Sequence, residues 1–309
     1  MFKLKRNQLG KSDIYVSELT LGCMSLGQDR NKAKEIIDTA LAQGINHLDT
    51  ADLYDFGLNE EIIGEIIKDR RQDVILTTKA GNHFSKETKD WFWDPSKKYI
   101  VQAAKNSLKR LQTDYIDFFM LHGGTMDDPI DETIEAMEEL KQEGLIRAYG
   151  ISSIRPNVID TYINKSSIDG VMLQYSLLDR RPEEDVLKQL ETNNISAIVR
   201  GPLAKGMLST YYKDNITKKA AKGFLDYNQT ELLETTKAIA ELRGGMPMNE
   251  LALKYVLQHP AVTTITFGAS TKEQVMENTK ADLATGLPEN LYEKLKEQTK
   301  RNIYEQHRV

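Results

Sequence analysis

The sequence predicts an α/β fold, a (β/α)8 (TIM) barrel, formed by a single domain over residues 1–309. Eight short apolar runs recur along the chain, and segments with helical spacing of apolar residues separate them. A continuous apolar run is typical of a strand buried on both faces, and strands that alternate with helices form parallel sheets. No linker rich in Pro, Gly or Ser divides the chain. A barrel needs about 250 residues, so there is room for additions.

The first element is a short β-hairpin, predicted from the alternation of apolar and polar residues over 3–18 around Gly10. The expected barrel strands lie near 19–23, 45–49, 74–79, 115–121, 147–151, 170–174, 195–199 and 262–266. The helices expected between them are 31–43, 59–68, 97–111, 131–143, 155–163, 182–192 and 271–281. For the fourth of these helices, Asp131-Glu132-Thr133 indicates the start and Gly144 the end.

Additions to the barrel are expected in four places. One is a loop rich in aromatic residues at 81–96, and another is a polar segment at 203–230 after the seventh strand. Two additional helices in the C-terminal region are predicted near 248–258 and 288–304. The alternative architecture, a doubly wound open sheet, requires the spacing G-x-G-x-x-G after its first strand, and the segment from Gly22 to Gly27 lacks it.

The composition excludes several classes of protein. The net charge of -5 argues against nucleic-acid binding or an anionic membrane surface as partner, since both require a basic face. Cys23 is the only cysteine, so no internal disulfide can form, and a reducing compartment is expected. No apolar stretch approaches the roughly 20 residues of a membrane span, and Met1–Arg6 lacks the apolar core of a signal peptide. A cytoplasmic protein is therefore expected; its oligomeric state stays open.

Four polar residues follow the second, third and fourth expected strands. Asp49 and Tyr54 come after the second strand, Lys79 ends the third, and His122 ends the fourth. In a (β/α)8 barrel these strand ends share the rim where active sites form. Each residue alone has an ordinary structural explanation, such as a helix cap or a packing tyrosine. Their gathering on one rim favours a chemical site.

Together these groups can polarise a carbonyl group and give it a proton. A free tyrosine has a pKa near ~10, and a neighbouring ammonium lowers it by stabilising the phenolate. Lys79 is placed to do this for Tyr54, and Asp49 can keep Lys79 charged. His122 can hydrogen-bond a substrate oxygen opposite Tyr54.

The motifs around these residues resemble the aldo-keto reductase family, here a bacterial NADPH-dependent member. The resemblance rests on Asp49-Thr50-Ala51-Asp52-Leu53-Tyr54, the Lys79 strand and Leu121-His122, and it extends over nearly the whole chain. It implies NADPH/NADP+ as cofactor and a small-molecule carbonyl compound as substrate. It also implies that Tyr54 is the general acid, supported by Lys79 and Asp49, and that His122 orients the carbonyl. No metal is implied, and the five histidines show no ligand spacing.

The resemblance also implies a set of cofactor contacts. Ser152 and Gln174 are expected at the nicotinamide carboxamide, with Ser153 where family members usually carry Asn. Lys272 is the candidate for the 2′-phosphate, with a plain surface lysine as the alternative. Gln274, Glu277 and Asn278 are expected along the adenosine. The remaining expected contacts lie at strand ends and in small-residue loops: Gly22, Cys23, Met24, Asp49, Gly201, Pro202, Leu203, Lys205, Gly206, Gly268, Ala269 and Ser270.

Arg200 ends the seventh strand, where many members of that family carry an aromatic residue that stacks on nicotinamide. A guanidinium is planar but always charged. Beside the ring, Arg200 is expected to disfavour the positively charged oxidised cofactor and so to favour NADPH. The alternative is that Arg200 pairs with a diphosphate oxygen or a nearby carboxylate.

Apolar residues in the loops after the first three strands predict a substrate pocket. Met24, Phe56, Trp91 and Trp93 are expected to line it, beside Tyr54 and His122. The alternative for the segment Trp91-Phe92-Trp93 is a small core that pins a long loop.

Three functions follow from these observations. The first is an NADPH-dependent carbonyl reductase. The second is an NADPH-binding, redox-sensing regulatory subunit with slow turnover, because the same barrel serves in channel-associated subunits. The third is an isomerase or aldolase that forms a Schiff base on Lys79. This third function requires a lysine without a carboxylate partner, and Asp49 argues against it.

Overall fold

Eight parallel strands close into a barrel in the computed structural model, which describes residues 4–309. All eight lie where the sequence predicts them, so the (β/α)8 fold class is confirmed. In order around the barrel they are β3 (Leu19–Gly22), β4 (His47–Asp49), β5 (Ile75–Ala80), β8 (Ile116–Leu121), β9 (Ile146–Ser152), β10 (Gly170–Gln174), β11 (Ser196–Arg200) and β12 (Val262–Gly268).

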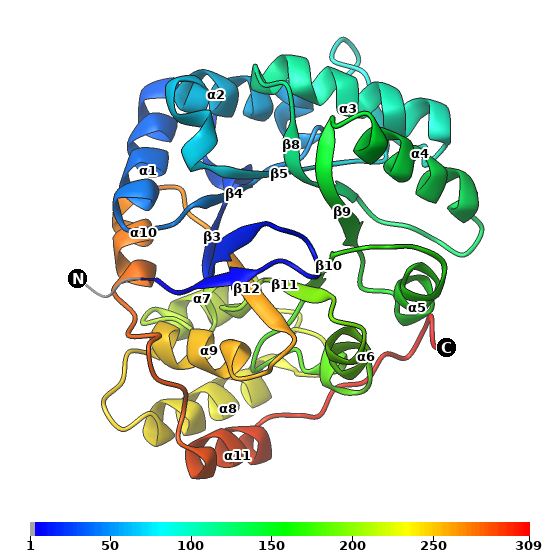
Figure 1. Ribbon diagram of the computed structural model, residues 1–309. Helices are drawn as coiled ribbons and strands as arrows, with labels where there is room; N and C mark the ends of the chain where they lie inside the picture. Colours follow the sequence, from blue (N-terminus) through cyan, green and yellow to red (C-terminus); the bar gives the residue numbers. More distant parts are fainter. Residues whose placement is uncertain (1–3) are drawn as a thin grey trace.

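Helices surround these strands, as Figure 1 shows. The side chain of Asp29 caps the first of them by accepting the N–H groups of Asn31 and Lys32. The helices that alternate with the strands are α1 (Arg30–Ala42), α2 (Leu58–Ile67), α3 (Lys97–Leu111), α4 (Ile130–Gln142), α5 (Pro156–Lys165), α6 (Val186–Thr192), α9 (Met248–Leu257) and α10 (Lys272–Thr279). Short 3-10 turns lie at η1 (Cys23–Ser25), η2 (Tyr54–Gly57), η3 (Lys68–Asp73), η4 (Arg181–Glu183) and η5 (Ala204–Gly206).

The C-terminal third holds more helix than the sequence predicts. Both predicted additional helices are present, as α9 and α11 (Glu289–Gln298), and α9 packs on β12 as the helix between the last two strands. The polar segment at 203–230 contains α7 (Tyr212–Lys219), and α8 (Gln229–Leu242) follows it; neither was predicted. Helix α11 ends at Gln298 rather than 304, because the backbone of Thr299 is extended.

A hairpin closes the end of the barrel opposite the carboxyl ends of the strands. Strands β1 (Arg6–Gln8) and β2 (Tyr15–Ser17) pair antiparallel, which confirms the predicted hairpin; its residue 3 lies outside the described residues. The apolar side chains of the hairpin pack inside the barrel against those of four strands; this cluster comprises Leu9, Ile14, Val16, Phe118, Met120, Ala148, Met172 and Ile198. The hairpin lies across the barrel in Figure 1.

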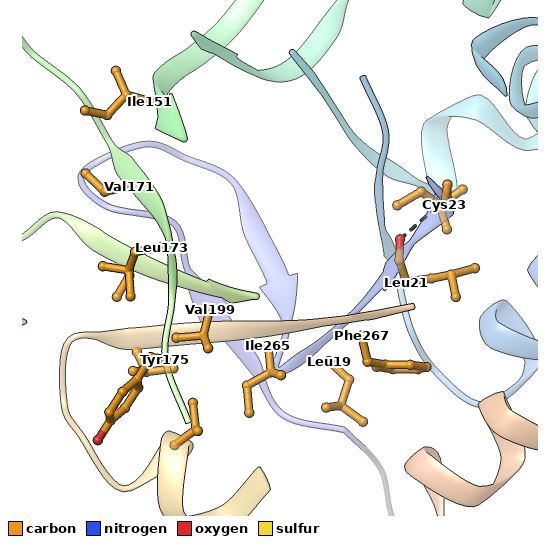
Figure 2. Packing of buried hydrophobic residues seen from close by; sticks show 14 of the residues in the cluster. Leu19, Leu21, Cys23, Ile151, Val171, Leu173, Tyr175, Val199, Ile265 and Phe267 are labelled. Atoms are coloured by element: carbon orange, nitrogen blue, oxygen red, sulfur yellow. Dashed lines mark hydrogen bonds between the residues drawn. The ribbon is translucent and has the colours of Figure 1, made fainter. Parts of the chain in front are cut away.

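A larger apolar layer lies between the strands and the helices, and Figure 2 shows part of it along β3, β10, β11 and β12. The barrel interior nearer the rim is polar instead. There His47 hydrogen-bonds Thr20 (2.7 Å) and Thr77 (2.6 Å) through its two ring nitrogens. Burial and the charge of Lys79 lower the pKa of His47 to about 3, so a neutral imidazole supports the floor of the site. Among residues 4–309, no helix is long and apolar enough to cross a membrane.

Candidate active site

Strand register brings the predicted catalytic residues to one rim of the barrel. Asp49 is the last residue of β4, Lys79 lies near the end of β5, and His122 directly follows β8. Tyr54 begins the turn η2 in the loop after β4. Parallel pairing also sets Gly22 beside both Asp49 and Gly268. These positions are the ones that the sequence predicts.

Asp49 and Lys79 form a buried ion pair. The Nζ atom of Lys79 lies 2.7 Å from Oδ1 of Asp49 and donates a hydrogen bond of 2.6 Å to the carbonyl oxygen of Thr50. The two side chains are 5% or less exposed. Burial alone lowers the pKa of Lys79, but the Asp49 carboxylate and the Tyr54 phenol outweigh it and raise the pKa. The Lys79 ammonium therefore stays charged at neutral pH.

Tyr54 lies between the ammonium and the imidazole. The Nζ atom of Lys79 is 5.4 Å from the centre of the Tyr54 ring, and the rings of Tyr54 and His122 meet edge to face at 5.9 Å. Burial raises the pKa of Tyr54, and Lys79 and Arg200 lower it by charge; the net direction is upward. Lys79 thus acts in the expected direction, but burial outweighs it, so the pKa of Tyr54 lies above its usual value in the protein alone. Tyr54 is a neutral phenol at neutral pH and holds a proton it can donate.

His122 has an unused hydrogen-bonding atom at the rim. Its Nδ1 atom is buried and has no partner among residues 4–309. Burial and the charges of Lys79 and Arg200 lower the pKa of His122 to about 3. A neutral imidazole can donate one hydrogen bond without delivering a charge. His122 is thus suited to orient an oxygen atom beside Tyr54 rather than to act as an acid.

A cavity of about 890 Å³ beside β11 and β12 gathers many of the predicted cofactor residues. We call it the glycine-lined cavity. Its lining includes Gly201, Pro202, Leu203, Lys205, Gly206, Gly268, Gln274, Glu277 and Asn278. Residues that the sequence analysis did not single out as cofactor contacts also line it: Ser25, Ser209, Tyr211, Asp214, Asn215, Lys218, Lys219, Asn249 and Thr266. The pair Lys218-Lys219 was visible in the sequence, but a basic run usually marks a solvated face.

The glycine-lined cavity fits an elongated anionic dinucleotide. A Cβ atom at Gly268 would lie 3.3 Å from Oγ of Ser25, so glycine keeps the passage between the two loops open. Gly201 and Gly206 have φ values of 70° and 86°, which favour glycine. Lysine ammonium groups and small-residue loops supply the donors that diphosphates need.

Other predicted cofactor residues lie outside that cavity. Ser152, Ser153 and Arg200 line a second cavity of about 510 Å³, described below, and Nη1 of Arg200 donates to Oε1 of Gln174 (3.0 Å). Cys23 and Ala269 are buried as whole residues, so they offer almost no surface to a ligand.

At the start of α10, two further predicted contacts already have partners within the protein. The side-chain oxygen of Gln274 accepts the backbone N–H of Ser270 (2.8 Å). Lys272 pairs with Glu35 at 2.5 Å, away from the glycine-lined cavity.

The aromatic loop forms a second hairpin that the sequence did not predict. Strands β6 (Asn82–Phe84) and β7 (Trp91–Trp93) pair antiparallel. Trp91 is 55% exposed and Met24 64% exposed, so both have free surface, and neither lines the glycine-lined cavity or the cavity of about 510 Å³. Trp93 packs over Gly81 and Gly123, and its Nε1 donates to Asp128 (2.9 Å). The hairpin is therefore both pinned through Trp93 and open through Trp91.

Comparison with known proteins agrees with this geometry. The aldo/keto reductase family profile matches residues 18–298. The uncharacterized oxidoreductase YqkF of Bacillus subtilis is 52% identical over 99% of this chain and 100% of its own. The holo form of aldo-keto reductase AKR11C1 from Bacillus halodurans superposes with a TM-score of 0.93 at 52% identity, covering 99% of this chain and 100% of that one. The chain belongs to the aldo/keto reductase family of oxidoreductases.

More distant relatives have different described roles. An NADH-specific methylglyoxal reductase of Escherichia coli is 30% identical over 90% of this chain and 93% of its own. A putative voltage-gated potassium channel subunit beta of Schizosaccharomyces pombe is 31% identical over 88% of this chain and 86% of its own. Family membership alone therefore leaves the cofactor and the biological role to be argued from the site.

Proposed function

We propose that the protein is an NADPH-dependent reductase of aldehydes and ketones, with Tyr54 as general acid. The observation that carries the proposal is the buried arrangement of Asp49, Lys79, Tyr54 and His122 around one point of the rim. Family membership supports oxidoreductase chemistry on a carbonyl group.

Each residue has a role that follows from its surroundings. His122 orients the carbonyl oxygen of the substrate with a neutral ring nitrogen. Tyr54 donates its phenolic proton to that oxygen, and the fixed charge of Lys79 stabilises the phenolate that remains. Asp49 holds Lys79 charged and in place through the pair at 2.7 Å. When bound, the reduced nicotinamide supplies the hydride.

NADPH is preferred over NADH in this proposal because the cofactor region offers several cations. Lys205, Lys218 and Lys219 line the glycine-lined cavity. Lys272, at the start of α10, can join them once it leaves its pair with Glu35. A 2′-phosphate adds nearly two negative charges, and these ammonium groups can form ion pairs with it. We further propose that Arg200 lies at the nicotinamide ring and favours the reduced cofactor.

Two other functions are less well supported. A Schiff-base aldolase requires an uncharged lysine, whereas Lys79 is paired with Asp49 and its pKa is raised. A redox-sensing subunit is favoured only by relatives described as channel subunits. The complete proton-transfer set favours turnover.

The test is NADPH oxidation at 340 nm with a panel of aldehydes and ketones, for wild type and Tyr54→Phe. The proposal expects turnover that collapses in the variant while NADPH binding, measured by fluorescence titration, persists. Tight NADPH binding without turnover of any carbonyl would favour the sensing subunit. Turnover that Tyr54→Phe leaves intact would remove Tyr54 from its proposed role.

A further inference from the structure

A cavity of about 510 Å³, lined in part by the two glycines that follow His122, carries three guanidinium groups. We call it the arginine-lined cavity. Its lining includes Gly124, Ser152, Ser153, Arg155, Arg181 and Arg200. The C-terminal segment at 303–307 also lines it.

The arginine-lined cavity adjoins the proposed catalytic residues through two connections. Its lining residues Gly123 and Gly124 directly follow His122 in the chain. Arg200, which also lines the cavity, acts on the site by charge, since its positive charge contributes to the lowered pKa of His122. A substrate whose carbonyl lies at Tyr54 and His122 can therefore extend into this cavity.

Two of the three guanidiniums face the cavity without a carboxylate partner. Arg181 is neutralised by Asp179 through two hydrogen bonds of 2.7 Å. Arg155 instead donates to the carbonyl oxygen of Gly124, and Arg200 donates to the amide oxygen of Gln174. Neither forms an ion pair with a carboxylate of residues 4–309. A guanidinium has five donors, so each keeps several for a ligand.

Carboxylates and hydroxyl groups also line the cavity. Asp226 and Glu305 also line the cavity, and Oδ2 of Asp226 is engaged by the amide of Asn302 at 2.6 Å. Ser152 and Ser153 also line the cavity, but they are the expected contacts of the nicotinamide carboxamide rather than of the substrate. With Arg181 paired to Asp179, two guanidiniums stand against two carboxylates in the lining. The unused donors of Arg155, and not a net positive charge, therefore favour an anion.

We propose that the arginine-lined cavity binds the carboxylate of negatively charged carbonyl substrates, with Arg155 as its anchor. Arginine and carboxylate form charge-assisted, often bidentate hydrogen bonds. Arg155 is a better anchor than Arg200, which is assigned to the cofactor ring. This inference rests on the proposed reductase function and names its substrate class, an aldehyde or ketone with a carboxylate at the far end of a short chain.

The experiment compares two substrates of nearly equal shape and different charge, 4-oxobutanoate and its methyl ester, with NADPH at low salt. The wild type should show a kcat/KM about tenfold higher for the acid, as expected for a charge-assisted bond that keeps some solvent contact. Arg155→Met should bring the ratio close to one, and Arg155→Lys should restore part of it. Added salt should lower kcat/KM for the acid and not for the ester.

Arg70→Met is the matched control, since Arg70 lies in the turn η3 and pairs with Asp38 of α1, and it should leave the ratio unchanged. If Arg155→Met lowers kcat/KM for the acid and the ester by the same factor, Arg155 only supports the Gly124 loop and the inference is overturned. A wild-type ratio of one or less overturns it as well. Turnover of neutral carbonyls alone refutes this inference only, whereas no turnover of any carbonyl refutes the reductase function itself.

Discussion

The buried pair Asp49–Lys79 should show strong energetic coupling. The two side chains are 2.7 Å apart and 5% or less exposed, so removing one leaves an uncompensated charge in a dry environment. Breaking such a pair costs about 3–5 kcal/mol of unfolding free energy. We expect Asp49→Asn and Lys79→Met each to lose an amount in that range. The double variant should be less destabilised than the sum, by about 3 kcal/mol, because it leaves neither charge unpaired.

Urea unfolding followed by circular dichroism and by fluorescence measures these differences, provided that the two transitions coincide. Lys237→Met is the control, because its pair with Glu241 spans 3.9 Å and is 72% and 69% exposed. It should leave the unfolding midpoint unchanged. Single costs below about 1 kcal/mol, or costs that simply add, would refute the view of a tightly coupled buried pair.

The cost of Lys79→Met should also depend on pH. Burial raises the pKa of the Asp49 carboxyl even with Lys79 present, and Lys79 is the main group that lowers it, so removing Lys79 should raise that pKa further. A carboxyl with a raised folded pKa contributes stability below its unfolded pKa near ~3.9 and loses it as pH rises through the folded value. The variant should therefore approach wild-type stability at low pH and fall furthest behind at neutral pH and above. A deficit that stays constant over that range would contradict this account.

Three further predictions concern other parts of the molecule. Burial and nearby cations lower the pKa of His122 to about 3, so the profile of kcat/KM against pH should show no inflection from His122 between pH 5 and 8. An inflection in that range that disappears in His122→Asn would contradict this prediction. Gly150→Ala should cost about 3 kcal/mol of unfolding free energy in thermal melts, because its Cβ would lie 2.0 Å from the carbonyl oxygen of Gly170. Gly268→Ala should cost less than about 1 kcal/mol. Equal losses in the two variants would refute the packing argument. Glu35→Gln should free Lys272 and so strengthen NADPH binding in fluorescence titrations. Lys272→Met should weaken NADPH binding several-fold without changing NADH binding. Unchanged NADPH affinity in both variants would make Lys272 a surface lysine.

The barrel was predictable because burial on both faces leaves a clear apolar signal in each strand. The missed helices lack such a signal. In α7 only Ile216 is buried, and in α8 the buried positions are Leu232, Thr236 and Ile239, so the apolar stripe is weak. The capping box formed by Asn228 and Glu231 was the available sequence signal for the start of α8.

The rim residues were predictable for a topological reason, and their partners were not. Consecutive parallel strands end at the same rim, so Asp49, Lys79 and His122 converge whatever the loops do. The pairing of Lys272 with Glu35 joins positions far apart in the chain and depends on how α10 packs against α1. Burial likewise reversed the expected direction of the Tyr54 pKa, because the depth of a loop residue is a tertiary property.

Gln174 determines how the role of Arg200 must be tested. Its Oε1 accepts from Arg200 at 3.0 Å, and its Nε2 donates to Asp179 at 2.8 Å, so the amide orientation is fixed from both sides. Arg200→Tyr would remove a charge and also one of these supports. Lost support should weaken the binding of NADPH and NADP+ by the same factor, as Gln174→Met should. Loss of the Arg200 charge should remove a repulsion from the positively charged ring of NADP+ and so strengthen NADP+ binding. The ratio of NADPH to NADP+ affinity should therefore fall. If Arg200→Tyr leaves that ratio unchanged, Arg200 serves to orient Gln174, and its proposed place beside the nicotinamide ring is wrong.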